Sequence, residues 1–449
     1  MFVSFLILNT NKFSTFNKQE TLFVHEMMTF TENYLKKIKP IHFFWLGIFF
    51  ISSAPLVASF FLLISIFSSF KSFKEFFKER WNYPLIASTI FMMIGAVYIK
   101  FDQSFFLQNN FEWKPDLLIL GLFNWIPFFW LFWAFQIFIT TQKERFIFAA
   151  LIVSSTIPVL ISGFGQYWFD WYGPFKTFNG LIIWYQREIA NGSGMTSLFN
   201  NQNYAAAWLS IAMPFSFACI NINRNFVPKL ISTLISFSIF IGIINTHSRS
   251  ALICGFLAIF FHLCLSINSR KKVYIFSILI TLLGTIVFAA KFDLSIFNIN
   301  LSIDRFSRSF GTLDLSRLEI WEFTLNSILK RPLLGWGSGS FPFAIKDLYS
   351  VWKGHPHNII LEIFFSYGIF VGITLSFFII NIFIKSFKEI FQNKNKSKNN
   401  IDKYWYFSSF ILLTTQMVDI QYFDFRFSLC LWILLSGLKN MTLSEASLK

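Results

Sequence analysis

Two histidines stand two positions apart in the sequence His355-Pro356-His357-Asn358, directly before a long apolar segment. Histidine is the side chain that exchanges a proton most readily near neutral pH, so a histidine here could act as a general base. A helix cap or half of a metal site would explain the same pattern. No third and fourth metal ligand stand nearby in the sequence. The spacing alone leaves these three interpretations open.

Arg249 stands in the short stretch Asn245–Ala251, between two apolar segments with almost no loop between them. An arginine at the centre of a membrane costs about 2.5–3.5 kcal/mol, so this one is expected to face the protein interior or to extend toward water. The planar guanidinium can also bond two oxygens of a diphosphate at once. Four more arginines fall on the same side of the predicted topology: Arg187, Arg305, Arg308 and Arg317. An anionic substrate would explain this unusual charge.

Two further patterns lie between these arginines and the histidines. Ser316 and Glu319 have the spacing of a capping box, and the apolar residues that follow recur at helical intervals until Pro332. This predicts a short amphipathic helix at the membrane surface whose face of Leu318, Trp321, Leu325, Ile328 and Leu329 packs against the protein. The glycine-rich stretch 335–340 could cradle phosphate oxygens with its backbone amides. It is more typical of a tight turn, because no P-loop lysine accompanies it.

Composition requires that these residues be positioned by membrane helices. Of 449 residues, 55% are hydrophobic and 14% are charged, whereas a soluble domain has about 25% charged residues. The net charge of +15 falls mainly in short loops, where it sets orientation in the membrane and does not predict nucleic-acid binding. The four cysteines lie in apolar runs and show no ligand spacing.

Apolar blocks of roughly 20 residues recur along the chain, and each is long enough to cross a hydrocarbon core as a helix. Because backbone groups in lipid must pair among themselves, the blocks predict an all-α polytopic membrane helix bundle. The predicted spans are 43–67, 84–100, 117–139, 146–163, 203–222, 227–246, 250–267, 273–290, 357–384, 405–419 and 425–438. Lysine-rich clusters flank 43–67 on both sides, so a helical hairpin broken near Pro55 is expected there. This gives about 11–12 spans with both termini cytoplasmic.

The pattern divides the chain into five parts. We expect an N-terminal tail (1–40), an N-terminal transmembrane bundle (41–290), a large periplasmic loop (291–356), C-terminal transmembrane helices (357–438) and a cytoplasmic tail (439–449). Long loops without obvious disorder are usually functional, so the loop 291–356 is expected to carry part of the site.

Several stretches, taken together in their order and spacing, resemble the O-antigen ligase and polymerase superfamily. They are Leu198–Ala205 followed by Pro214, Ser248–Ala251, Arg317–Trp321, Arg331–Gly337, His355–Asn358, Glu362 and Tyr367–Gly368. Gln202 stands where the family commonly has proline. The resemblance covers roughly residues 43 to 438.

The resemblance implies a bundle similar to the lipid-dependent glycosyltransferases, in the bacterial inner membrane with its active site facing the periplasm. Family members take a glycan from an undecaprenyl-diphosphate carrier, and ligases move it to the lipid A core. By motif, His357 would be the catalytic residue, and Arg249 and Arg317 would bind the diphosphate. His355 is a second candidate for the base. Candidate substrate contacts are Arg187, His355, Asn358 and Asn203.

The expected partners are the lipid-linked donor, a lipid A core or other glycan acceptor, and membrane lipid, with no nucleic acid, no cofactor and no essential metal. A polymerase that extends a carrier-linked chain fits the same residues. Transport of an anion such as bicarbonate is a third hypothesis. It predicts discontinuous helices with an internal repeat, and no repeat is visible in the sequence.

Overall fold

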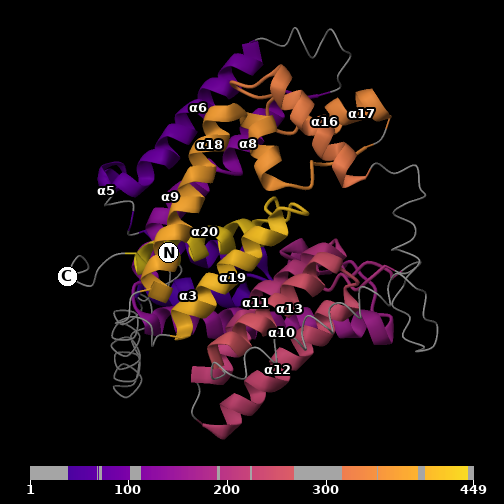
Figure 1. Ribbon diagram of the computed structural model, residues 1–449. Helices are drawn as coiled ribbons and strands as arrows, with labels where there is room; N and C mark the ends of the chain where they lie inside the picture. The colour runs from indigo at the N-terminus through magenta and orange to yellow at the C-terminus, as the bar shows by residue number, and fades with distance from the viewer. Residues whose placement is uncertain are drawn as a thin grey trace, which may run out of the picture.

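The computed structural model describes residues 39–67, 69, 73–101, 113–189, 193–222, 225–266, 316–350, 352–392 and 400–442. This part of the chain is helical apart from one two-stranded ribbon, so the expected all-α membrane fold is confirmed (Figure 1). The predicted span 273–290, most of the N-terminal tail, and the residues Arg305 and Arg308 lie outside the described residues.

Six helical segments of the described chain are long and apolar enough to cross a membrane. They comprise η3 (Arg80–Asn82) with α6 (Tyr83–Phe101); α8 (Asp116–Phe123), α9 (Ile126–Ala134) and η4 (Phe135–Phe138); α10 (Gln142–Phe169); α11 (Gln202–Ile222); α12 (Phe226–Asn245); and α18 (Ile359–Phe387) with η7 (Lys388–Gln392). The shorter elements are α3 (Pro40–Phe50), α4 (Pro55–Ile66), α5 (Phe73–Lys78), α13 (Arg249–Ser266), α16 (Arg317–Lys330), α17 (Phe341–Tyr349), α19 (Asn400–Gln416), α20 (Phe425–Met441), β1 (Phe175–Thr177), η5 (Phe178–Gly180) and β2 (Ile182–Trp184).

The first apolar block forms the helical hairpin that the charge pattern predicts. α3 and α4 pack side by side on either side of the turn Ile51–Ala54, and Pro55 starts the second helix. Gly47 permits this close approach, because a Cβ atom there would lie 2.6 Å from Cγ of Leu62. At the buried tip, the Ser52 hydroxyl donates a hydrogen bond to the Ser155 carbonyl of α10.

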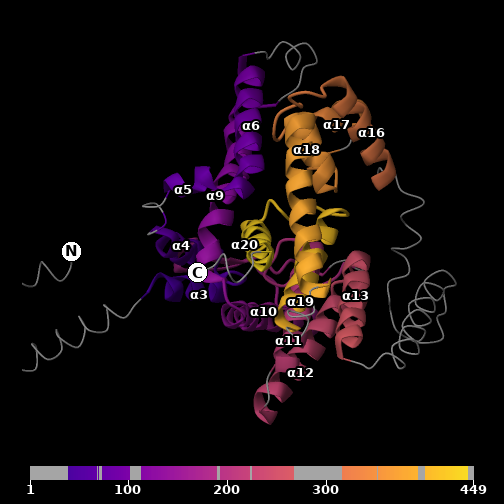
Figure 2. The same cartoon turned by 60° about the vertical axis from the view of Figure 1, so that its left-hand side comes forward.

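α20 lies at the centre of the described helices and is buried along nearly its whole length (Figures 1 and 2). It contacts α9, α18 and α19. The helix continues to Met441, three residues beyond the expected boundary at 438. Lys439 is therefore part of the bundle: it is buried, pairs with Glu79 and donates to Gln136.

The predicted span 357–384 is two helical segments joined at a sharp break. Gly368 has φ 81° and ψ −178°, outside the helical region. The chain 332–337 packs into the break, where the Ile369 amide donates to the Pro332 carbonyl at 2.7 Å and the Trp336 amide donates to the Phe365 carbonyl at 2.8 Å. Backbone groups released by the break are thus paired again, as a membrane environment requires.

Candidate active site

His357 lies in the turn that leads into α18, and its backbone has a left-handed φ of 55°. The next residue, Asn358, caps the helix: its side-chain oxygen accepts hydrogen bonds from the amides of Ile360 and Leu361, at 3.0 and 3.2 Å. Its amide nitrogen donates to the Met417 carbonyl at 3.2 Å. The structure therefore gives Asn358 the role of holding the histidine turn at the start of α18 and against the loop after α19.

Asp419, in the loop between α19 and α20, is the partner that orients His357. Nδ1 of His357 lies 2.8 Å from Oδ1 of Asp419, whose side chain is 6% exposed. The amide of Asn203, at the start of α11, donates to Oδ2 of the same carboxylate at 3.0 Å. Burial acts to raise the pKa of Asp419, but the hydrogen bond from His357, the charges of both histidines and the bond from Asn203 outweigh it and hold the pKa below its usual range.

His355 supports the same turn from the other side. Its Nδ1 accepts a hydrogen bond from the His357 backbone amide at 3.2 Å, and its Nε2 lies 4.0 Å from Oδ1 of Asp419. Burial, and then the neighbouring charge of His357, lower the pKa of His355 to about 4. His355 is therefore neutral near pH 7. Because Nδ1 is the acceptor, the ring proton is on Nε2.

The three side chains His355, His357 and Asp419 place one ligand atom each within 4.8 Å of one another. Asp419 thus supplies the third metal-type ligand that is absent from the neighbouring sequence. The hydrogen bonds place a proton on Nδ1 of His357 and on Nε2 of His355. In this protonation state the arrangement suits proton transfer, with Nε2 of His357 as the nitrogen that can receive the proton.

Contacts between segments connect two of the stretches that carry the family resemblance, Leu198–Ala205 and Ser248–Ala251, with this site. The Gly194 amide donates to the Gln202 side chain at 2.6 Å, beside Asn203. Gly194 also lies against the turn between α12 and α13, because a Cβ atom on it would be 2.0 Å from the Thr246 carbonyl oxygen. The loop before α11 therefore joins the start of α11 to the segment that contains Arg249.

Of the predicted arginines that the structure describes, two lie at the starts of helices and one lies in a loop. Arg249 is the first residue of α13 and Arg317 is the first residue of α16, and both are exposed. α16 reaches the histidine turn through Trp321, whose indole N–H donates to the Pro356 carbonyl at 3.0 Å. A helix start carries partial positive charge, so an arginine there strengthens an anion-binding potential. Arg187 is exposed, and its backbone is held by Gln166 and Thr196.

Residues 234–376 match the family model described as O-antigen ligase. We refer to these matched residues as the O-antigen ligase domain. The resemblance expected from the sequence is therefore confirmed. A ComP-specific O-oligosaccharyltransferase of Acinetobacter baylyi is 26% identical to this chain over 189 residues. The alignment covers 40% of this chain and 33% of that relative, so the chain spans about a third of its length. The family and this relative are both named for the transfer of a glycan.

The O-antigen ligase domain contains Arg249, Arg317, His355 and His357. Asp419, which bonds His357, and Asn203, which bonds Asp419, lie outside it. Asn203 precedes the matched residues and Asp419 follows them. The sequence predicted Asn203, although as a substrate contact. It missed Asp419, which stands between apolar neighbours in Met417–Ile420. An acid within an apolar segment is a functional candidate by default, and this signal could have identified it.

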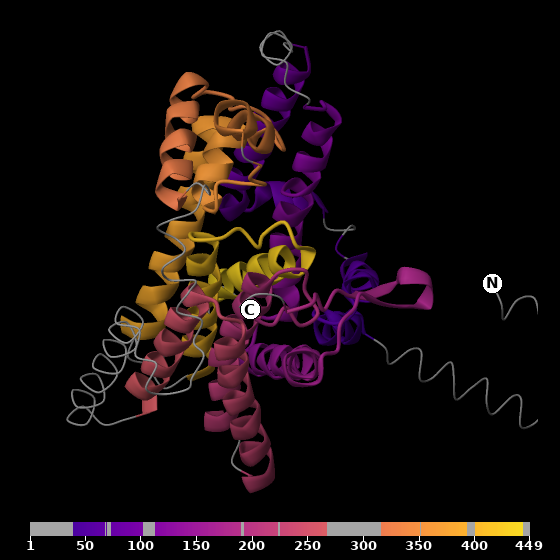
Figure 3. The same cartoon turned by 90° about the vertical axis from the view of Figure 1, so that its right-hand side faces the viewer.

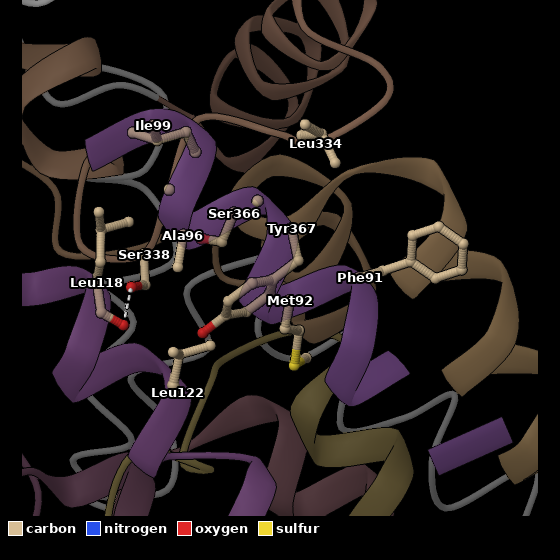
Figure 4. Close-up of a pocket in the computed structure, with 12 residues that line it drawn as sticks. Phe91, Met92, Ala96, Ile99, Leu118, Leu122, Leu334, Ser338, Ser366 and Tyr367 are labelled. Carbon is tan, nitrogen blue, oxygen red and sulfur yellow. Dashed lines mark hydrogen bonds between the residues drawn. The ribbon is translucent and has the colours of Figure 1, made fainter. Parts of the chain in front are cut away.

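The glycine-rich stretch of the O-antigen ligase domain is a packing turn. The amides of Trp336 and Gly337 pair with carbonyls of α18, so they cannot cradle a phosphate. Gly121 of α8 lacks a side chain where Ser338 approaches, since a Cβ atom there would lie 1.9 Å from the Ser338 hydroxyl oxygen. A small cavity remains beside the turn, between α6, α8 and α18 (Figure 4). None of the predicted site residues lines it.

The amphipathic helix of the domain forms as predicted, but its buried face is a different one. α16 begins with the capping box of Ser316 and Glu319, and Ile320, Phe323, Thr324 and Ser327 face the interior. Leu318, Leu325 and Leu329 are more than half exposed. The expectation was wrong for these three leucines and right for Trp321 and Ile328, which pack against the interior beside Ile320 and Phe323, so the buried face is shifted around the helix.

Proposed function

We propose that this chain transfers a glycan from a polyprenyl-diphosphate carrier to an acceptor hydroxyl on the periplasmic face of the bacterial inner membrane, as an O-antigen ligase does. The observation that supports the proposal best is the hydrogen bond of 2.8 Å between His357, inside the family-matched segment, and the buried carboxylate of Asp419.

In the proposed reaction, Nε2 of His357 takes the proton of the acceptor hydroxyl as its oxygen attacks the anomeric carbon of the glycan. The bond from that carbon to the diphosphate breaks, and the diphosphate leaves with its electron pair. Arg249 and Arg317 would stabilise the charge that builds on the leaving group. Asp419 would stabilise the imidazolium that His357 becomes, while keeping its ring in the required tautomer.

Three acceptors are consistent with this chemistry. The lipid A core is the acceptor that the resemblance implies, and a polymerase would use another carrier-linked glycan. The Acinetobacter relative is described as an O-oligosaccharyltransferase specific for ComP, which makes a protein hydroxyl a third candidate here.

The test is a comparison of surface glycans and glycoproteins in a strain that lacks the chain, complemented with wild type, His357→Ala, Asp419→Asn or Arg249→Ala at matched expression. A bare lipid A core with accumulated carrier-linked polymer, rescued only by wild type, is the result expected for a ligase. Single repeats on the core would indicate a polymerase. A missing protein glycan with intact lipopolysaccharide would indicate a protein acceptor. An unchanged profile would reject glycan transfer and favour anion transport.

The proposed orientation has its own test. Asp347 is exposed on α17, beside the site in sequence, and Lys78 is exposed on α5, in a cluster expected to be cytoplasmic. In intact cells, a thiol reagent that does not cross the inner membrane should label Asp347→Cys and leave Lys78→Cys unlabelled until the membrane is opened. Labelling of Lys78→Cys alone would place the site on the cytoplasmic face and contradict the proposal.

A further inference from the structure

The ribbon formed by β1 and β2 exposes an unusual number of aromatic side chains. Phe175, Phe178, Trp171 and Tyr185 are all more than 40% exposed, and Lys176 is the single charged residue in 171–185. Figure 3 shows the ribbon, in magenta, reaching beyond the neighbouring helices. A two-stranded ribbon of three residue pairs is marginal in water by itself, and an exposed aromatic patch promotes aggregation. We therefore expect this surface to contact a binding partner or lipid.

The tip of the ribbon holds a phenylalanine outward in a costly backbone conformation. Phe178 has φ 51°, Asn179 has φ 54° and Gly180 has φ 87°. Left-handed backbone is rare for a bulky residue and costs of order 1–3 kcal/mol. Phe178 is nevertheless 78% exposed, the most exposed side chain of the ribbon's large hydrophobic residues. The conformation is not compensated by packing of this ring within the protein, so an external contact is the expected reason for it.

The ribbon continues the apolar surface of a membrane span. On α10, Ile157, Ile161 and Trp168 follow one another at intervals of four and seven residues and are all exposed, which makes one outer face of the helix. Phe169 ends the helix and is 67% exposed, and Trp171 and the ribbon follow directly. At 28 residues α10 is longer than the roughly 20 needed to cross the hydrocarbon core. We therefore place its last turn at the membrane–water boundary.

The base of the ribbon is fixed to the bundle. The indole N–H of Trp184 donates to the Ser53 carbonyl at the tip of the α3–α4 hairpin, at 2.8 Å. The Gly173 amide donates to the Gln186 carbonyl at 2.8 Å, and the Gln186 amide donates to Ser197 at 3.2 Å. The ribbon is thus held rigidly between the hairpin and the loop that leads to Arg187 and α11.

We propose that the β1–β2 ribbon is a lipid-interface anchor, which inserts Phe178 and its aromatic neighbours among the headgroups and upper acyl chains of the leaflet beside the active site. Tryptophan, tyrosine and phenylalanine suit this zone because their rings are apolar and tolerate neighbouring water. Lys176 can extend toward lipid phosphates. Since the same loop carries Arg187 and leads into Asn203, the anchor sets the height of these residues above the lipid that delivers a membrane-bound donor.

The test uses the full chain in nanodiscs of phosphatidylethanolamine and phosphatidylglycerol, with a fluorophore on Phe178→Cys. Cys264 is half-buried and is replaced by alanine, while the other three cysteines are buried. Asp347→Cys on α17 is the exposed control. We expect lipids with a nitroxide near the headgroup to quench the label at 178 several-fold more than the control, and aqueous iodide to do the reverse. A second pair places the label on Leu181→Cys, with and without Phe178→Asp, and the aspartate should abolish quenching by the nitroxide lipids.

Equal iodide quenching at positions 178 and 347 would overturn the proposal, because the ribbon would then lie in water. Shielding that develops only after an acceptor protein is added would also overturn it and would assign the ribbon to a protein partner. Neither readout requires glycan transfer, so the result is independent of the proposed reaction.

Discussion

At the scale of single residues, the candidate site consists of His357, which can exchange a proton, and several side chains that fix the orientation of its ring and backbone. Asp419 determines the tautomer of His357, Asn203 satisfies the other carboxylate oxygen, and His355 receives the backbone amide of His357. These contacts favour His357 as the base in the proposed reaction. His357 has its Nδ1 oriented by the carboxylate, whereas the Nδ1 of His355 is occupied by the backbone.

Asp419→Asn should leave the fold in place and slow glycan transfer by about 10²- to 10⁴-fold, because asparagine can fill the space but cannot stabilise an imidazolium. The rate is measured with purified protein and a lipid-linked donor, and thermal unfolding is measured alongside it. Asp347→Asn, on the exposed surface of α17, should retain the wild-type rate. A rate for Asp419→Asn within a few-fold of wild type would show that His357 does not depend on this carboxylate.

His355 should make the protein less stable as the pH falls from 6.5 to about 4. The unfolded chain binds a proton on this ring near pH 6.5, whereas the folded protein binds it only near the lowered pKa of about 4. Between these two pH values, proton binding therefore stabilises the unfolded state relative to the folded state. The loss reaches about 3 kcal/mol at the lower limit. Asp419, whose pKa is held below its usual range, loses its contribution to folding stability only at pH values below this window.

Thermal unfolding of wild type and His355→Gln between pH 7 and pH 4 tests this expectation. Glutamine removes the titrating group, so the stability difference between the two proteins should shrink or reverse as the pH falls. Curves that stay parallel across the window would contradict a neutral, half-buried His355.

At the scale of elements, breaks and short loops position the site. The turn between α3 and α4 and the kink of α18 each interrupt an apolar block that would otherwise be one straight helix. The break at Gly368 admits the chain 332–337, and this pairing holds the glycine-rich turn and α16 beside the start of α18.

Gly368→Ala should destabilise the protein by at least about 2 kcal/mol and disturb transfer, because alanine strains a φ of 81° and its Cβ would lie 2.1 Å from the Leu333 carbonyl oxygen. Gly354→Ala is the matched control. No atom lies within 4 Å of a Cβ built at Gly354, which directly precedes His355. Its stability should change by less than about 0.5 kcal/mol. Equal thermal unfolding of the two variants would show that the break in α18 is not required.

At the scale of the whole molecule, polar contacts tie distant helices together inside an apolar bundle. Arg145 is buried in α10 and bonds both carboxylate oxygens of Asp402 of α19, at 2.8 and 3.2 Å. It also donates to the carbonyls of Ile139 and Thr140 at the end of the preceding segment. One side chain therefore joins three parts of the chain.

Arg145→Met should lower stability by about 3–5 kcal/mol, since it leaves the buried Asp402 carboxylate without a partner. The double variant Arg145→Met with Asp402→Leu should recover most of the loss, because no buried charge remains. Lys78→Ala removes an exposed ion pair with Glu75 and should have little effect. A double variant as unstable as Arg145→Met would show that the carbonyl contacts of Arg145 matter more than its charge.

The sequence by itself determined the membrane class, the positions of most helices and the residues that carry the family resemblance. These features depend on apolar length, helical spacing and local capping, all of which are properties of neighbouring residues. This reasoning could predict the helix starts at Arg249, Arg317 and Ile359. It could not predict which face of α16 is buried, because that depends on what α16 packs against.

Only the tertiary structure decided which polar residues meet. Asn203, His357 and Asp419 stand far apart in the chain, and each belongs to a different helix boundary. Asp419 and Asp402 are both buried carboxylates beside an isoleucine, yet Asp419 bonds a histidine and Asp402 pairs with an arginine. The difference lies in the folded neighbours, since a buried charge is stable only where other helices supply its hydrogen-bond partners.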